Sequence, residues 1–279
     1  MPEKDLIMTA TTTGPGFFGK VPSHGDFITR RVPRSFLEPW DEWLQKAVAR
    51  SKEQLEADWL DTYLTSPIWR FVLSSGVCSD QPYAGVLMPS VDKVGRYFPL
   101  TITAAIPKGF NILQLPKDVN EWFDNAEQKA LSALEEPFNL DEFDREVEQL
   151  DIPVAVTAST QLNPTASAIS SHTSGRSTHT KIPASHDMVG PYIRLLHHYL
   201  TLLNKNYSIW WTSGSYKVQP CMLICGGLPP VDGFSAFLDG RWSLWGWQQE
   251  EESHIVYEKN TAAEDAPTPH IPADWEYPV

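Results

Sequence analysis

The sequence predicts an α/β protein built as a three-layer sandwich, in which a central, mainly mixed β-sheet is covered by helices on both faces. Helical and strand-like patterns alternate along the chain, as they do in proteins of this class. Several strand-like segments are apolar on both faces, and residues 100–106 are the clearest example. The 279 residues, 42% of them hydrophobic, are enough to bury such a core. The order of the strands does not follow from this pattern.

The strongest helical signal spans residues 35–49, where apolar side chains recur at intervals of three and four and so share one face. Ser35 and Glu38 have the spacing of a capping box, and Pro33 lies just before them. The residues on the apolar face are Phe36, Trp40, Trp43, Leu44, Ala47 and Val48. Further helices are predicted at residues 117–135, from Asn139 and Glu142 onward, and at 191–203.

Seven short segments have the composition of strands, namely residues 17–20, 68–73, 84–89, 98–106, 152–157, 207–212 and 220–225. We expect residues 14–247 to form a single domain. A stretch rich in Ser and Thr at about 157–188 offers little to bury and is predicted to be a flexible insertion. Residues 248–279 are acidic, contain several prolines and are predicted to be a tail.

The charge, the apolar segments and the cysteine count of the chain limit which partners and which cellular location we expect. The formal net charge is −13, which disfavours nucleic acid as a partner and suits a basic protein surface better. No segment is long and apolar enough for a membrane span, and the first residues lack the features of a secretory signal. Only three cysteines occur, which fits a reducing compartment. We therefore expect a cytoplasmic protein without membrane insertion.

Residues 14–20 match the spacing of a phosphate-binding P-loop, but the residues that follow are not those that a P-loop requires. Val21 follows Lys20 where a P-loop has Ser or Thr for magnesium, and Pro22 disfavours a helix at this point. Two phenylalanines in the segment favour a strand instead. We expect no nucleotide, metal or other cofactor here.

The next residues, Ser23, His24, Gly25 and Asp26, include the residue types of a hydrolase triad. Groups so close in sequence do not easily align nucleophile, base and orienting acid, because such triads are assembled from separate elements. A turn supported by Asp26 is the favoured interpretation. A ligand-binding loop and a catalytic site remain as alternatives.

A second polar loop joins the strands predicted at 84–89 and 98–106. It carries Ser90, Asp92 and Arg96, and such a set on a rigid scaffold is typical of a site. Asp92 and Arg96 are close enough in sequence to pair and fix the loop, which is the favoured interpretation. Alternatively, Arg96 points outward and donates to a partner's carboxylate or phosphate.

Six segments of the chain form a distinctive set. They are Gly16-Phe-Phe-Gly-Lys-Val-Pro-Ser-His-Gly-Asp-Phe-Ile28, Trp40-Asp-Glu-Trp-Leu44, Ser66-Pro-Ile-Trp-Arg-Phe71, Gly85-Val-Leu-Met-Pro-Ser-Val-Asp-Lys-Val-Gly-Arg-Tyr-Phe-Pro-Leu100, Ser208-Ile-Trp-Trp-Thr212 and Gly227-Leu-Pro229. Together they resemble the TagF family of type VI secretion-associated proteins. The resemblance is dense over residues 14–106 and patchy to about 238.

This resemblance implies a cytoplasmic α/β accessory protein that acts as a post-translational repressor. It also implies a partner, the forkhead-associated scaffold protein that promotes assembly of the secretion apparatus. The leading hypothesis is therefore a non-enzymatic regulator, with Ser23, His24, Asp26, Ser90, Asp92 and Arg96 as candidate partner- or ligand-binding residues. The alternative is a small-ligand or phosphopeptide-binding module, which requires the two polar loops to converge. The sequence does not indicate the oligomeric state.

Overall fold

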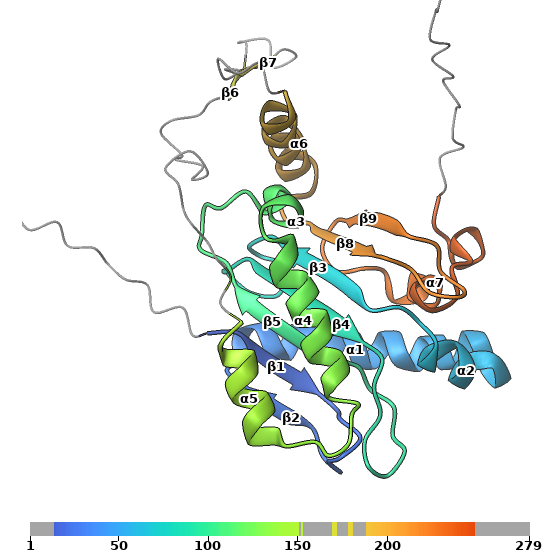
Figure 1. Cartoon of the computed structure of the whole chain (residues 1–279). Coiled ribbons are helices and arrows are strands. Elements are labelled where there is room, and N and C mark those ends of the chain that lie inside the picture. The colour runs from blue at the N-terminus through green and yellow to red at the C-terminus, as the bar shows by residue number, and fades with distance from the viewer. Residues whose placement is uncertain (1–13, 151, 153–168, 172–177, 181–187, 249–279) are drawn as a thin grey trace, which may run out of the picture. The chain divides into compact units, whose positions relative to one another are not determined.

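The computed structural model describes residues 14–150, 152, 169–171, 178–180 and 188–248. A seven-stranded sheet runs through it in the order β2-β1-β5-β4-β3-β8-β9 (Figure 1). Its strands are β1 (Gly16–Gly19), β2 (Ile28–Arg30), β3 (Trp69–Leu73), β4 (Tyr83–Met88), β5 (Leu100–Ala105), β8 (Ser208–Thr212) and β9 (Cys221–Cys225).

The α/β class is confirmed, but the prediction of a mainly mixed sheet is wrong. Every pairing between neighbouring strands of this sheet is antiparallel. The reason is visible in the connections, since β1 and β2, and β3, β4 and β5, follow one another in the chain and are joined without a crossover helix. A pattern of apolar residues on both faces reports that both faces are covered, not that the strands are parallel.

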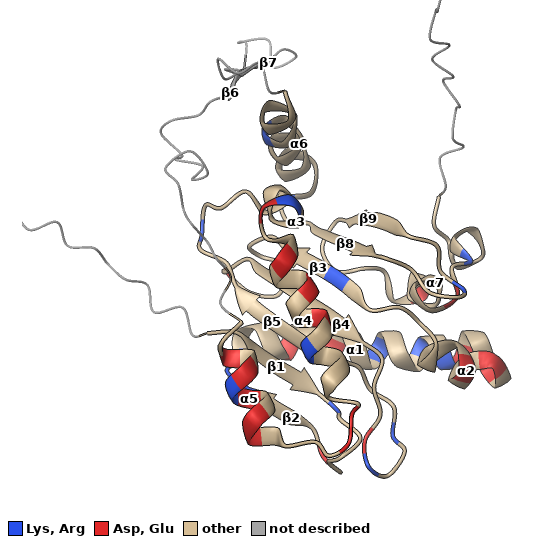
Figure 2. Cartoon of the chain, in the orientation of Figure 1, with Lys and Arg blue, Asp and Glu red and all other residues tan. Residues whose placement is uncertain are grey.

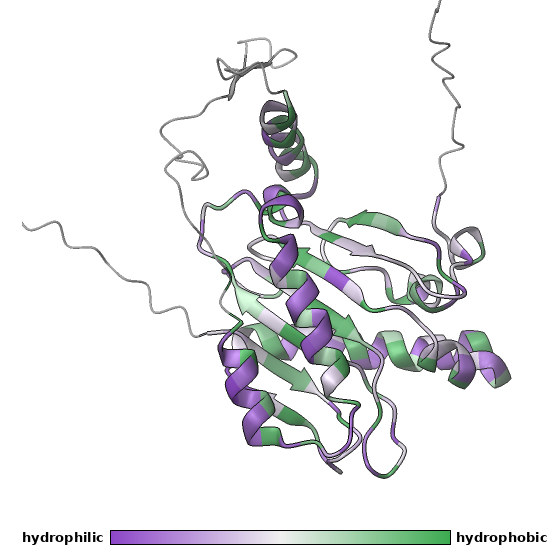
Figure 3. Cartoon of the chain, in the orientation of Figure 1, coloured by the Kyte–Doolittle hydropathy of each residue, from purple (hydrophilic) through white to green (hydrophobic). Residues whose placement is uncertain are grey.

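Helices cover both faces of the sheet, as the sequence predicts. On one face lie α1 (Arg34–Leu55), α2 (Trp59–Leu64) and α7 (Ser235–Asp239), and on the other lie α4 (Asn120–Ser132) and α5 (Leu140–Glu148). Successive strand residues alternate between the two cores; Phe17 packs with the α4–α5 side and Phe18 with the α1 side. Figure 3 shows the apolar strands beneath the hydrophilic outer surfaces of α4 and α5.

The core on the α1 side is built from aromatic rings. Trp40 and Trp210 stack in parallel with their ring centroids 5.9 Å apart, and Phe71 and Trp43 contact both. All six residues predicted to form the apolar face of the first helix are buried. The predicted capping box is wrong, because Pro33 is the N-cap and Ser35 and Glu38 lie inside the helix without a capping bond. The helix also continues six residues beyond its predicted end.

The other predicted elements agree with the structure in type more than in length. The helix predicted at 117–135 is divided into α3 (Leu115–Asp118) and α4, and α6 spans Val189–Asn204. Asn139 caps α5 by accepting hydrogen bonds from the backbone N–H groups of Asp141 and Glu142, as predicted. Short 3-10 helices occur at Glu56–Asp58, Ile112–Gln114, Val231–Gly233 and Trp242–Trp245.

Two sequence predictions concern residues that are largely outside the described part of the chain. The strand predicted at 152–157 has only residue 152 described. Within the predicted insertion, β6 (Ile169–Ser171) and β7 (Thr178–Thr180) form an antiparallel hairpin, and the rest is not described. The predicted division into a domain at 14–247 and a tail at 248–279 stays a prediction.

Candidate functional site: two converging loops

The two polar loops singled out in the sequence meet beside the ends of β1, β4 and β5, and Asp92 lies at their junction. Its Oδ2 accepts a hydrogen bond from Lys20 Nζ at 2.8 Å and another from Arg96 Nε at 2.6 Å. Its Oδ1 accepts from the backbone N–H groups of Val94 at 3.0 Å and Arg96 at 2.8 Å. The Asp92–Arg96 pair suggested by the sequence is thus present, and Lys20 joins it from the other loop.

Electrostatics explain why this carboxylate stays ionised although Asp92 is only 3% exposed. Burial by itself would raise the pKa of Asp92, but the hydrogen bonds from Lys20, Arg96 and Val94 outweigh that effect. The pKa of the Asp92 carboxyl therefore lies well below its ordinary value. A buried ion pair is stable only when its remaining lone pairs are satisfied, and here four donors satisfy them.

Ser90 holds the base of the same loop. Its hydroxyl donates to the carbonyl oxygen of Lys20 at 2.7 Å, which links the two loops again. Its backbone N–H donates to the Tyr63 hydroxyl, which in turn donates to the Ser90 carbonyl oxygen, each at 3.0 Å. Burial raises the pKa of Tyr63 above its ordinary value. Ser90 is buried and has a structural role, so it is not available on the surface.

The loop that contains Ser23, His24 and Asp26 does not form a triad. Ser23 Oγ lies 2.9 Å from His24 Nδ1, but Asp26 does not reach the imidazole in the described part of the chain. The Asp26 side chain is fully exposed, and its carboxylate is 3.9 Å from the Arg96 guanidinium. Arg96 also donates to the carbonyl oxygen of Gly25. Backbone atoms complete the junction, since the N–H of Lys93 donates to the carbonyl oxygen of His24 at 2.9 Å.

What the junction leaves exposed is a mixed apolar and charged surface. Phe27 is 46% exposed, stacks on Phe18 and meets Phe98 edge to face. Val94, at the tip of the other loop, is 68% exposed. Ser23 and Gly95 are also exposed in these loops. We call five of the exposed residues the loop surface; they are Asp26, Phe27, Lys93, Val94 and Arg96. Aromatic and arginine side chains are enriched in protein–protein interfaces, so this composition suits a macromolecular partner.

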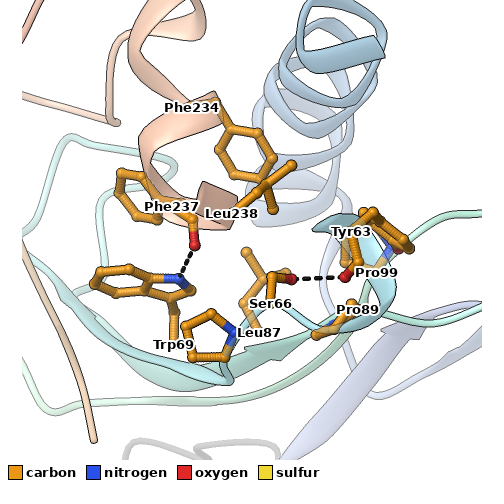
Figure 4. A pocket seen from close by; sticks show the side chains of 10 residues that line it. Tyr63, Ser66, Trp69, Leu87, Pro89, Pro99, Phe234, Phe237 and Leu238 are labelled. Carbon is orange, nitrogen blue, oxygen red and sulfur yellow. Dashed lines mark hydrogen bonds between the residues drawn. The ribbon is translucent and has the colours of Figure 1, made fainter. Parts of the chain in front are cut away.

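Two pockets in the described part of the chain are not lined by Asp92. One is an apolar crevice between the sheet and α7 (Figure 4), where Trp69 donates to the carbonyl oxygen of Phe237 at 3.0 Å. Its volume of about 10 Å³ is that of roughly one water molecule, so it is a packing feature. A second, open hollow beside His24 is lined by residues 137–142 and by none of Asp26, Ser90, Asp92 and Arg96.

Two comparisons with known proteins place the chain. Residues 16–150 match the family model described as the TagF N-terminal domain, type VI secretion system-associated. The crystal structure of PA0076 from Pseudomonas aeruginosa PAO1 is similar at 33% sequence identity with a TM-score of 0.68, covering 81% of this chain and 94% of that one. The chain belongs to the TagF family. No curated protein matches it.

Both loops of this TagF-family chain lie inside the matched residues 16–150, whereas α6, β8 and β9 lie outside them. The family assignment from the sequence is therefore confirmed, and with it the association with type VI secretion. None of the helices that the structure describes has both the length and the apolar character needed to cross a membrane. Within the same residues, no group of three or more His, Cys, Asp or Glu side chains is arranged to hold a metal ion.

Sequence reasoning missed the role of two buried cations. Lys20 was noticed only as part of the failed P-loop match, yet it directly follows strand β1, which leads into β2 rather than into a helix. Arg70, the second residue of β3, donates to Asp124 and Glu127 on α4 at 2.6 and 2.7 Å. In both cases the sequence did contain a signal, because a single cation lies within an apolar strand or at its end. Such a buried charge requires a partner, so the pattern could have predicted an ion pair.

Proposed function

We propose that this TagF-family chain is a cytoplasmic, non-enzymatic regulator that represses type VI secretion post-translationally by binding a forkhead-associated scaffold protein. Membership in a type VI secretion-associated family supports the context. The partner and the direction of regulation come from the resemblance described above. The loop surface is the part of the molecule that we assign to the contact.

The observation that carries the proposal is that some residues of the two loops hold the loops together while others are exposed to solvent. Asp92 and Ser90 use their polar atoms to hold the loops together. Asp26, Phe27 and Val94 are left exposed on a scaffold that is thereby rigid. A rigid, partly apolar surface loses little conformational entropy on association and so favours binding of another protein.

Catalysis and nucleic-acid binding have less support. Ser23 and His24 have no orienting carboxylate at the imidazole in the described residues, and Asp92 is enclosed by its own donors. The net charge of −13 repels a phosphate backbone. A function by binding protein requires neither a nucleophile nor a cofactor.

Two experiments test the proposal together. The tagged chain, produced at its natural level, is expected to co-purify with the forkhead-associated scaffold protein, with and without residues 249–279. Deletion of the gene is expected to raise secretion in cells, and restoration of the chain is expected to lower it again. Unchanged secretion after deletion, or a scaffold protein absent from the purified material, would contradict the proposal.

The second candidate function is recognition of a small anionic ligand or phosphopeptide by Arg96. The observation in its favour is convergence, because Asp26 and Arg96 come within 3.9 Å of each other although they are far apart in sequence. It requires the guanidinium to exchange its bonds to Asp92 and Gly25 for bonds to the ligand. Titration with a phosphothreonine peptide tests it, and Arg96→Lys, which cannot form a bidentate pair, should abolish the binding.

A further inference from the structure

The two edges of the central sheet differ in their protection. The β2 edge has only three residues, includes Arg30, and is followed by Arg31 with a positive φ of 52° and by Pro33. A short strand, a charge and a proline are devices that prevent pairing with another chain. At the opposite edge β9 has five residues, Cys-Met-Leu-Ile-Cys, with no charge or proline among them. In the described part of the chain, the outer side of β9 pairs with no strand.

The exposed face of β9 is apolar. Met222 is 64% and Ile224 39% exposed, and in the antiparallel register they lie opposite Trp211 and Ile209 of β8. Ile209 belongs to the core on the α4 side, and Leu200 of α6 packs into the same core. Exposed apolar side chains continue along α6 at Tyr192, Leu196, Leu202 and Leu203. Asn204, the last residue of α6, lies next to Gly226, which follows β9. Exposed apolar side chains therefore occur both on the unpaired strand and on the helix whose end reaches it, an unusual combination for a monomer.

Charge indicates which partner fits this face. Residues 218–231 contain no charged residue, and residues 188–231 contain no Asp or Glu, although the whole chain has a net charge of −13. Many of the described acidic residues lie instead on the helices α1, α2, α4 and α5, while β9 is uncharged (Figure 2). Two copies of so acidic a chain repel each other over most of their surfaces. Around β9 they meet without that repulsion.

We propose that β9 pairs with β9 of a second copy, antiparallel about a two-fold axis, so that two seven-stranded sheets become one. If the pairing is centred on Leu223, Met222 of one copy lies opposite Ile224 of the other, and apolar side chains meet across the junction. A stable interface requires about 800 Å² from each partner, more than two short strands supply, so α6 contributes the remainder. Because each copy has one unprotected edge, assembly stops at the dimer.

The test is the molar mass in solution, measured by sedimentation equilibrium over a dilution series. The wild-type chain is expected to reach twice the monomer mass, and Met222→Lys/Ile224→Lys is expected to remain a monomer because lysines then face lysines across the axis. The control Leu60→Lys/Leu64→Lys adds the same charge at comparably exposed leucines on α2, on the other face of the sheet, and should still dimerise. A monomeric wild type, or a Met222→Lys/Ile224→Lys dimer, would overturn the proposal.

A second measurement uses the wild-type chain alone, so it does not depend on whether the Met222→Lys/Ile224→Lys variant folds. Backbone amides on the outer side of an unpaired edge strand exchange with solvent quickly, and strand pairing slows them. Hydrogen exchange of residues 221–225 in the wild-type chain is expected to slow as concentration rises through the range in which mass doubles. Exchange that stays equally fast at every concentration would place any dimer contact elsewhere and refute the pairing of β9.

Discussion

Lys20→Met removes one of the two cations that hold Asp92, and its cost follows from the contacts of the ammonium group. Lys20 is 6% exposed, its Nζ donates to Asp92 at 2.8 Å, and it lies 4.9 Å from the centroid of the Phe27 ring. Removing one partner of a buried ion pair typically costs 3–5 kcal/mol. Asp92 keeps three of its four donors in the variant. We therefore expect the lower end of that range for Lys20→Met, about 3 kcal/mol.

Equilibrium unfolding in urea measures this cost. With a slope of about 3 kcal/mol per molar urea, the midpoint should fall by roughly 1 M. The same substitution at Lys46, whose partner Glu42 is exposed, is the control and should leave the midpoint unchanged. The double variant Lys20→Met/Asp92→Asn should regain part of the loss, because it leaves no unpaired buried charge. If Lys20→Met unfolds at the wild-type midpoint, the idea that this pair fixes the two loops is wrong.

Three further predictions concern the core, pH and thiols. Trp40 is fully buried and donates to Thr101 Oγ1 at 3.0 Å, so Trp40→Ala should lower the free energy of unfolding by about 3–5 kcal/mol in the same urea assay. The pKa of the Asp92 carboxyl is lowered in the folded chain, so the ionised carboxylate contributes its full stabilisation above about pH 4 and loses it as the pH falls further. This pH-dependent contribution to the free energy of unfolding should be absent in Asp92→Asn. Burial raises the pKa values of Cys78 and Cys225 to about 12, so a thiol reagent at pH 8 should modify at most one of the three cysteines until the chain is unfolded.

The sequence predicted local structure well where the signal was local. The apolar spacing from Phe36 to Val48 and the Asn139 cap each concern residues within a few turns of one another, and both agree with the structure. Strand β2 was missed because three residues are too few to show alternation. The antiparallel sheet was missed because strand direction depends on which strands become neighbours, a property that hydrophobic pattern does not encode.

Of the contacts in the candidate site, the sequence predicted only the one between residues close together in the chain. Asp92 and Arg96 are four residues apart, and their pairing followed from the loop itself. The pairing of Lys20 with Asp92 spans 72 residues, so nothing in either segment alone predicted it. Ser90 was chosen for its polarity, but its burial depends on Tyr63, which comes from a different element. The role of these residues in partner binding stays a prediction.

The most direct test of the account is the affinity of the forkhead-associated scaffold protein for loop-surface variants, measured by isothermal titration calorimetry. Asp26→Arg/Val94→Asp changes two exposed side chains and should leave the fold intact. We expect its dissociation constant to rise at least about tenfold, as for interface hot spots. Asp118→Arg, an exposed change on α3 at the opposite end of the sheet (Figure 1), should bind like the wild type. Equal affinity of the wild type and the loop variant would contradict the assignment of the loop surface as the contact.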